Sequence, residues 1–150
     1  MSLTHWLLRV GDGSHFLSSQ PLKRWGVNSK HNNCVPSFLR NVNRGDILWF
    51  IQGGNGGKVL GVAEFHRHCP RELGPLIAVT PTNEDLGWVN VPGEWDTEVH
   101  YTELYDTTKV EIYTKIQAAL VIRRYNPEKC VGDLPQIHSN IVRFSRAKLV

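Results

Sequence analysis

The chain has 150 residues, of which 41% are hydrophobic and 21% are charged. This balance suits one folded domain and excludes an intrinsically disordered protein. The net charge of +3 is compatible with a polyanionic partner but is too small to identify one.

The cysteine pattern and the absence of long apolar runs indicate the class of protein. The three cysteines, Cys34, Cys69 and Cys130, are odd in number and widely spaced, which favours reduced thiols over a disulfide framework. No apolar run reaches the length of a membrane span, and the N-terminus has no signal-peptide pattern. The sequence therefore predicts an intracellular protein, cytoplasmic or nuclear, with no membrane association.

The chain begins with a predicted strand and a short helix. Residues 4–10 (THWLLRV) form an apolar run that ends in Gly11-Asp12-Gly13, the pattern of a buried strand followed by a turn. Ser14 is the predicted N-cap of one or two helical turns over residues 15–20, which Pro21 ends.

A polar segment and a second short helix follow. Residues 24–33 (RWGVNSKHNN) are basic and rich in amides, and they predict a loop that contains Trp25. Residues 35–42 predict a short helix with Pro36 near its start.

The clearest pattern is a hairpin in the middle of the chain. Residues 43–46 predict a turn, and residues 47–51 (ILWFI) predict a strand that is buried on both faces. Residues 53–57 (GGNGG) predict a hairpin loop, from which a strand over residues 58–65 returns. Two neighbouring strands buried on both faces predict a closed or strongly curled sheet such as a small barrel.

The second half of the chain gives weaker signals. Residues 66–87 predict an irregular segment, residues 87–95 a loop with two tryptophans, and residues 97–105 a half-exposed strand. Residues 109–125 mix strand-forming and helix-forming patterns, and the sequence does not separate the two. We further predict a loop at 126–139 and a closing strand at 141–144. No linker or internal repeat interrupts the chain, so we predict a single domain over residues 1–150.

Three short motifs suggest chemistry that their context does not support. The GGNGGK stretch at 53–58 lacks the first glycine and the Ser or Thr of a phosphate-binding loop. The His66-Arg-His-Cys69 run lacks the second ligand pair of a typical zinc site. Cys34 lies near His31, but no known nucleophile signature surrounds it. We therefore predict no catalytic residue, no metal and no cofactor.

The five tryptophans divide into two groups. Trp6 and Trp49 lie in apolar strands, so we expect them in the core. Trp25, Trp88 and Trp95 lie in polar segments containing Gly or Pro, where binding residues collect. Either they pack as plugs over the core, or they present flat faces on which a base stacks.

Several pieces in a fixed order resemble the EVE domain of the PUA-like superfamily. They are HWLLRVGDG at 5–13, WGVNSKHNN at 25–33, Arg44-Gly-Asp46 before the apolar strand, and LGVAEF at 60–65. The chain is similar, more loosely, to YTH domains. The resemblance implies an α+β fold, a PUA-like small mixed β-barrel flanked by short helices. It also implies a non-enzymatic module that binds DNA or RNA and captures a modified base in an aromatic pocket.

The resemblance also implies which residues form the site. Those expected to wall the pocket or contact the base are Gly11, Asp12, Trp25, Val27, Asn28, Ser29, Asn32, Trp88 and Trp95. The basic residues expected to contact phosphates are Lys23, Arg24, Lys30, His31 and Arg40.

Two alternatives stay open at the level of sequence. Related PUA-like proteins of the ASCH group suggest a hydrolase acting on RNA or modified nucleosides, in which Lys30, His31 and either Glu64 or Glu94 would converge. A protein-interaction scaffold would instead use exposed Trp88 and Trp95 as contacts.

Overall fold

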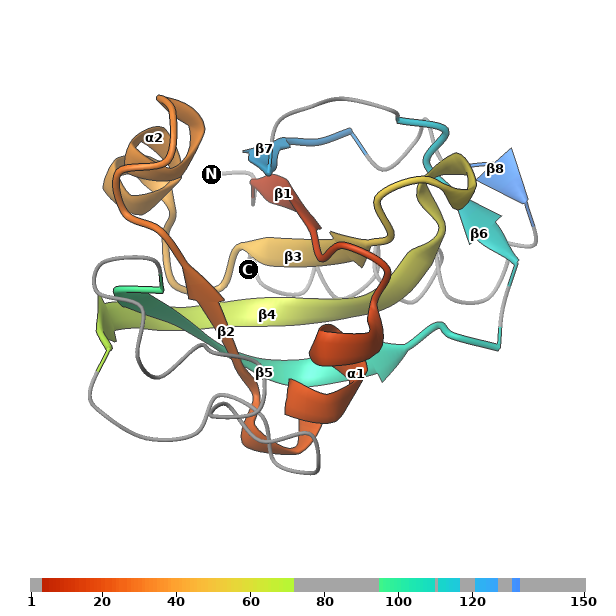
Figure 1. Cartoon of the computed structure of the whole chain (residues 1–150), viewed down its shortest axis with the longest axis horizontal. Coiled ribbons are helices and arrows are strands. Elements are labelled where there is room, and N and C mark those ends of the chain that lie inside the picture. Colours follow the sequence, from red (N-terminus) through yellow and green to blue (C-terminus); the bar gives the residue numbers. More distant parts are fainter. Residues whose placement is uncertain (1–3, 72–94, 110, 117–120, 127–130, 133–150) are drawn as a thin grey trace, which may run out of the picture.

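The structure is a computed structural model that describes residues 4–71, 95–109, 111–116, 121–126 and 131–132. It contains a six-stranded sheet in the order β2-β5-β4-β3-β1-β7 and a two-stranded sheet of β6 and β8 (Figure 1). The elements in chain order are β1 (His5–Arg9), α1 (Ser14–Ser19), η1 (Gln20–Leu22), β2 (Arg24–Val27), α2 (Cys34–Asn41), β3 (Ile47–Ile51), η2 (Asn55–Gly57), β4 (Val59–Pro70), β5 (Thr97–Asp106), β6 (Ile112–Tyr113), β7 (Ile122–Arg124) and β8 (Val131–Gly132).

Strand β3 lies inside the sheet, between β4 and β1, and is buried along its whole length. Because side chains alternate across a strand, Leu48 and Phe50 face one hydrophobic core while Trp49 faces another on the opposite side. Trp6 and Trp49 are both buried, so the prediction that they belong to the core is confirmed.

Both α-helices contribute to the same face of the sheet. Phe16 of α1 and Phe38 of α2 are fully buried in the core that also contains Trp6, Leu8 and Phe50. Figure 1 shows α1 in front of the sheet at β5, and α2 on the side where β3 begins. The coarse prediction of an α+β fold with short flanking helices is therefore confirmed.

The sheet is not closed into a barrel, and the finer prediction is wrong on this point. In the described part of the chain, β2 and β7 are the two edges, and each pairs with a single neighbour. Closure requires the two edge strands to hydrogen-bond to each other. The edge strands Arg24–Val27 and Ile122–Arg124 are not paired with each other, so the sheet stays open between them.

Local patterns misplaced two strands. Residues 24–27 form β2 and not a loop, because Trp25 and its neighbours pair with β5 in antiparallel register. Strand β4 runs to Pro70, past the predicted end at residue 65, because His68, Cys69 and Pro70 also find partners on β5. In both cases the partner strand lies far away in the sequence, where a local pattern cannot reveal it.

The start of α1 also differs from the prediction. Gly13, with a φ of 93°, is the N-cap, whereas Ser14 is the first helical residue. The Asp12 carboxylate accepts hydrogen bonds from the Ser14 amide at 2.9 Å and from its hydroxyl at 2.8 Å. A carboxylate at the beginning of a helix satisfies an amide that has no partner inside the helix.

Other predicted elements have mixed outcomes. The predicted hairpin is confirmed, since residues 53–57 connect β3 to β4 and contain η2. The strand predicted over 97–105 is confirmed as β5, and the helix predicted over 35–42 as α2. The ambiguous segment 109–125 contains β6 and the whole of β7. The loop predicted over 126–139 is wrong at Val131–Gly132, which form β8 by pairing with β6. The strand predicted at 141–144 and most of the irregular segment 66–87 lie outside the described residues. None of the helices in the described ranges has the length and hydropathy needed to cross a bilayer.

Candidate functional site

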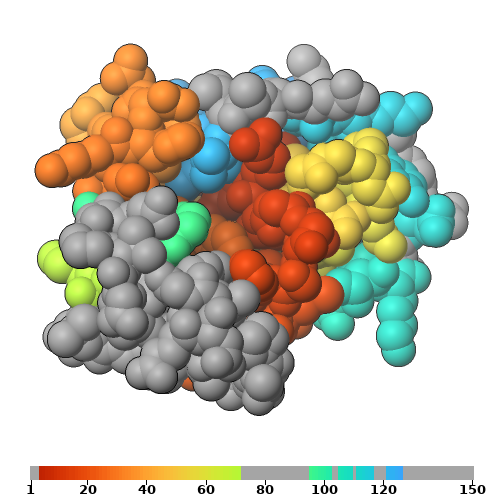
Figure 2. Space-filling view, in the orientation of Figure 1, coloured from red at the N-terminus to blue at the C-terminus, as the bar shows by residue number. Residues whose placement is uncertain are grey.

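A pocket of about 440 Å³ opens between β2 at one edge of the sheet and the residues beside β1 and β7 at the other. Figure 2 shows the hollow near the middle of the face, where red, orange, green and blue atoms meet. Its volume lies in the usual range for small-molecule sites. The lining residues are Arg9, Val10, Gly11, His15, Trp25, Gly26, Val27, Asn28, His31, Val35, Trp95 and Val121.

Trp25 forms one wall of the pocket and is held from behind. Its ring meets the ring of Phe16 edge to face, with centroids 6.1 Å apart, and Phe16 stacks on Phe50 at 4.5 Å. The Trp25 backbone pairs with Val99 of β5. An indole that is partly buried against a packed aromatic row loses little freedom when a ligand stacks on it.

Trp95 reaches the same pocket from a distant part of the chain, and its neighbour Asp96 fixes that segment. The Asp96 carboxylate accepts hydrogen bonds from the Ser29 amide at 2.8 Å and from the Ser29 hydroxyl at 2.6 Å. Ser29 follows β2 directly after Asn28, another residue of the lining. This Ser29–Asp96 pair therefore ties the segment with Trp95 to the loop that continues from Trp25.

The ionised form of Asp96 is the form that these hydrogen bonds favour. Burial alone raises the pKa of the Asp96 carboxyl, but the hydroxyl and amide of Ser29 outweigh it, and the pKa lies below 3.8. A carboxyl group with a lowered pKa in the folded state adds stability above its unfolded pKa and loses it as the pH falls through the folded value.

We expect Asp96→Ala to lower the free energy of unfolding by about 1–2 kcal/mol near neutral pH, because the two charge-assisted hydrogen bonds from Ser29 and a third from the Thr97 hydroxyl are lost. The difference from the parent should shrink as the pH falls below the ordinary value of 3.8 for an aspartate. Urea denaturation at several pH values measures this difference. The matched control is Ser29→Ala, which keeps the hydrogen bond from the backbone amide and should lower the free energy of unfolding by less than Asp96→Ala does. A gap between parent and Asp96→Ala that stays constant from pH 7 to pH 3 would contradict the assignment.

Polar groups lie at the rim of the pocket. Arg9, His15, Asn28 and His31 all line it. The side-chain carbonyl of Asn28 accepts the Lys30 amide at 2.9 Å, so the amino group of Asn28 is the part that can donate to a ligand. The rim thus offers donors and a cation beside a mostly apolar interior.

A second hollow lies on the other side of the start of α2 and is basic. Its lining residues are Trp6, Asn32, Asn33, Cys34, Ser37, Arg40, Ile122, Arg123 and Arg124, with three arginines and no carboxylate among them. Arg124 lies over the Trp6 ring at 5.5 Å. His31 and Asn32 are consecutive residues that line the first and second hollows, respectively.

The predicted base-contacting residues do not all meet in the pocket. Gly11, Trp25, Val27, Asn28 and Trp95 line it. Asp12 is exposed and accepts a hydrogen bond from the Ser14 amide, at the beginning of α1. Ser29 donates a hydrogen bond to Asp96, and Asn32 lines the second hollow. Trp88 lies outside the described residues.

The predicted phosphate-contacting residues are dispersed. His31 lines the pocket and Arg40 lines the second hollow. Arg24 forms an ion pair with Glu98 at 3.5 Å. Lys23 and Lys30 are exposed, and neither belongs to the described lining of either hollow.

Sequence reasoning missed half of the pocket. Arg9, Val10 and Gly26 lie within the quoted motifs but were not predicted as site residues, and His15, Val35 and Val121 follow from no motif. The turn after β1 was the available signal, because Gly11 was already expected at the edge of the pocket. Val121 carried no signal, since only the pairing of β7 with β1 brings it near.

The geometry does not assemble either catalytic alternative in the described residues. The Cys34 thiol lies 3.7 Å from the backbone carbonyl of His31, and the His31 ring lies beside the Asn32 amide. The lining of the pocket includes His31 but, in the described part of the chain, neither Lys30 nor Glu64. Glu94 lies outside the described residues.

Comparisons with known proteins find likeness in shape but not in sequence. No protein-family profile matches the chain, and no curated protein matches it in sequence. A hypothetical protein from Leishmania major is similar with a TM-score of 0.48 and 12% identity, over 99% of this chain and 98% of that chain. A protein from Pseudomonas putida is similar with a TM-score of 0.48 and 13% identity, over 94% of this chain and 99% of that chain. The MmI1 YTH domain has a TM-score of 0.36 and 8% identity, over 69% of this chain and 66% of that chain. These similarities show no family for the chain, and membership of the EVE family stays a prediction.

Proposed function

We propose that the protein is a non-enzymatic nucleic-acid-binding module that captures one base, preferably a modified one, in the pocket walled by Trp25 and Trp95. The observation that carries the proposal is that these two tryptophans, 70 positions apart in the sequence, line one pocket of about 440 Å³. The resemblance of the sequence to EVE domains, and through them to the PUA-like superfamily, is consistent with this function.

The walls of the pocket suit a flat aromatic ligand. Stacking of a base on an aromatic side chain contributes about 1–3 kcal/mol of binding free energy, and this depends little on which base it is. Val10, Val27 and Val121 supply apolar surface around the two indoles. A methyl group on the base would add about 0.8 kcal/mol when it is buried there. A methylated base should therefore bind more tightly than its unmodified counterpart.

The rim and the neighbouring hollow suit the rest of a nucleotide strand. Asn28, His31 and Arg9 place hydrogen-bonding groups where the edge of a captured base would lie. Arg40, Arg123 and Arg124 give the second hollow a positive charge that attracts phosphates. A strand that inserts one base into the pocket would meet these arginines across the start of α2.

The test is a binding assay with single-stranded DNA and RNA oligonucleotides that carry unmodified or methylated bases. We expect the parent to bind at least one methylated oligonucleotide, and Trp25→Ala to weaken that binding about 10–100-fold because one stacking surface is lost. Trp95→Ala should weaken it to a similar degree. Fluorescence anisotropy at constant salt measures both changes.

The control variant separates loss of stability from loss of binding. Trp49→Phe alters a fully buried indole in the core opposite the pocket side, so it should lower stability but leave affinity within about twofold. Trp25→Phe, which keeps an aromatic face, should retain most of the binding. If Trp25→Ala binds the whole panel as tightly as the parent does, the proposal is wrong. Turnover of RNA or of modified nucleosides by the parent would instead favour the hydrolase alternative.

A further inference from the structure

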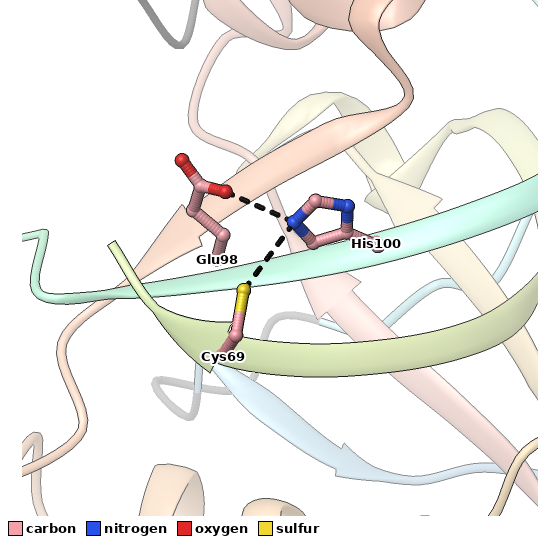
Figure 3. A group of neighbouring side chains, drawn as sticks. All are labelled: Cys69, Glu98 and His100. Carbon is pink, nitrogen blue, oxygen red and sulfur yellow. Dashed lines mark hydrogen bonds and ion pairs between the residues drawn. The ribbon is translucent and has the colours of Figure 1, made fainter. Parts of the chain in front are cut away.

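Strands β4 and β5 bring together a thiol, a carboxylate and an imidazole outside the aromatic pocket. Cys69 pairs directly with Glu98 across the two strands, and His100 lies two residues beyond Glu98. Because side chains two residues apart in a strand point to the same face, the three groups share one side of the sheet. Figure 3 shows all three converging, with Cys69 on β4 and the other two on β5.

We propose that Cys69, Glu98 and His100 form a zinc-binding site with three protein ligands and a fourth position left for water. The sequence alone predicted no metal, since His66-Arg-His-Cys69 has no second ligand pair nearby along the chain. The fold supplies the missing ligands from a strand that begins 28 positions later.

The distances between the ligand atoms fit a single metal ion. The Cys69 thiol sulfur lies 3.6 Å from Nε2 of His100, and a Glu98 carboxylate oxygen lies 2.9 Å from the same nitrogen. All three atoms lie within 4.8 Å of one another. Zinc bond lengths of about 2.0–2.3 Å and tetrahedral angles place such atoms about 3.5 Å apart. The two distances to Nε2 lie close to that spacing, and side-chain rotation would bring the sulfur and the carboxylate oxygen to it.

The convergence on one nitrogen distinguishes a metal site from a proton relay. In a relay of thiol, imidazole and carboxylate, the thiol and the carboxylate contact opposite ring nitrogens. Here both groups approach Nε2, and Figure 3 shows the other ring nitrogen pointing away from them. A metal ion that replaces the proton on Nε2 would bind all three donor atoms at once.

The chemistry of the three donors favours zinc over harder cations. A thiolate, an imidazole and a carboxylate are its common ligands, whereas magnesium and calcium take oxygen ligands. One thiolate and one carboxylate balance the charge of the ion. Arg24 contacts the other oxygen of Glu98 at 3.5 Å, which orients the carboxylate in the way that neighbouring hydrogen-bond partners orient metal ligands. The Glu98 side chain is 7% exposed and that of His100 is 20% exposed, so the site is sheltered but reachable.

The first experiment uses the chelator-treated full chain and titrates it with zinc, and separately with cobalt as a spectroscopic substitute. We expect one equivalent of zinc per chain in calorimetry, and a thiolate-to-cobalt band in the near ultraviolet. Cys69→Ser should abolish the band and lower zinc affinity at least tenfold, as should His100→Gln. The matched control Cys34→Ser, which alters the other free thiol of the described chain, should retain both.

A second measurement works on the parent alone and does not depend on how the variants fold. Alkylation followed by mass spectrometry reports the accessibility of each thiol, and zinc should slow the modification of Cys69 at least tenfold while leaving Cys34 unchanged. Failure of the parent to take up zinc, or equal protection of both thiols, would overturn the proposal. The zinc site does not involve Trp25 or Trp95. A chain that binds no zinc would therefore leave the base-binding proposal intact, and a chain that binds no base would leave the zinc proposal intact.

Discussion

Asp46→Ala should lower the free energy of unfolding by about 3–4 kcal/mol, one of the largest losses expected for a polar residue of this chain. The buried Asp46 carboxylate accepts the indole N–H of Trp6 at 3.1 Å, the Asn43 amide at 2.9 Å and the Thr4 amide at 3.3 Å. Removing it leaves the Trp6 donor buried without its acceptor, and it loosens the turn that leads into β3.

The matched control is Asp106→Ala, which removes an exposed carboxylate that also accepts hydrogen bonds, from the amide and hydroxyl of Thr108. Water replaces the lost partner there, so we expect a loss of about 1 kcal/mol or less. Thermal and urea denaturation measure both variants. Equal losses for the two variants would contradict the structural role given to Asp46.

Phe16→Ala should lower the free energy of unfolding by about 3–5 kcal/mol, since it opens a large cavity in the main core. Phe16 is fully buried, stacks on Phe50 at 4.5 Å, and meets Trp25 edge to face at 6.1 Å. The same change removes the support behind one wall of the pocket, so we also expect weaker binding of the oligonucleotides that the parent prefers.

Phe16→Leu separates the two effects. Leucine keeps most of the apolar volume, so the loss of stability should fall to about 1–2 kcal/mol. Binding measured at a temperature where both proteins are fully folded then reports on the support of Trp25 alone. Full parent-like affinity in a folded Phe16→Ala protein would show that the position of Trp25 does not depend on Phe16.

The elements that the sequence predicted well are those whose signal is local. The ILWFI run at 47–51 is buried on both faces because each of its two alternating sets of side chains faces a core of its own. The GGNGG loop must reverse the chain, and Gly54, Asn55, Gly56 and Gly57 adopt the positive φ values that such a turn needs. These constraints act within a few residues, so a pattern in the sequence can express them.

The elements that the sequence misplaced depend on distant partners. Arg24–Val27 becomes a strand only because β5 lies beside it, and residues 66–70 extend β4 for the same reason. The open edge of the sheet could not be foreseen either, because whether β2 and β7 pair is a contact between segments far apart in the sequence. The opening that results is where the aromatic pocket lies.

The candidate sites follow the same division. The local pattern left open whether Trp25 and Trp95 plug the core or present a flat face, and the resemblance to EVE domains implied a pocket wall; both line the pocket. Asp96 was not among the predicted site residues, yet it binds Ser29, which lies 67 positions away. Glu98 and His100 join Cys69 only through strand pairing.

The most direct test of the central claim observes the tryptophans themselves during binding. The chain contains five, and each gives one indole N–H signal in a nitrogen-15 NMR spectrum, which single Trp→Phe variants assign. Trp49 serves as the internal reference, since it is buried in the core on the other side of the sheet and its indole N–H group donates to His5. On titration with the tightest-binding methylated oligonucleotide, we predict that the signals of Trp25 and Trp95 shift together and saturate at the same concentration, while that of Trp49 stays in place. Saturable binding that leaves the signals of Trp25 and Trp95 unmoved would contradict the account.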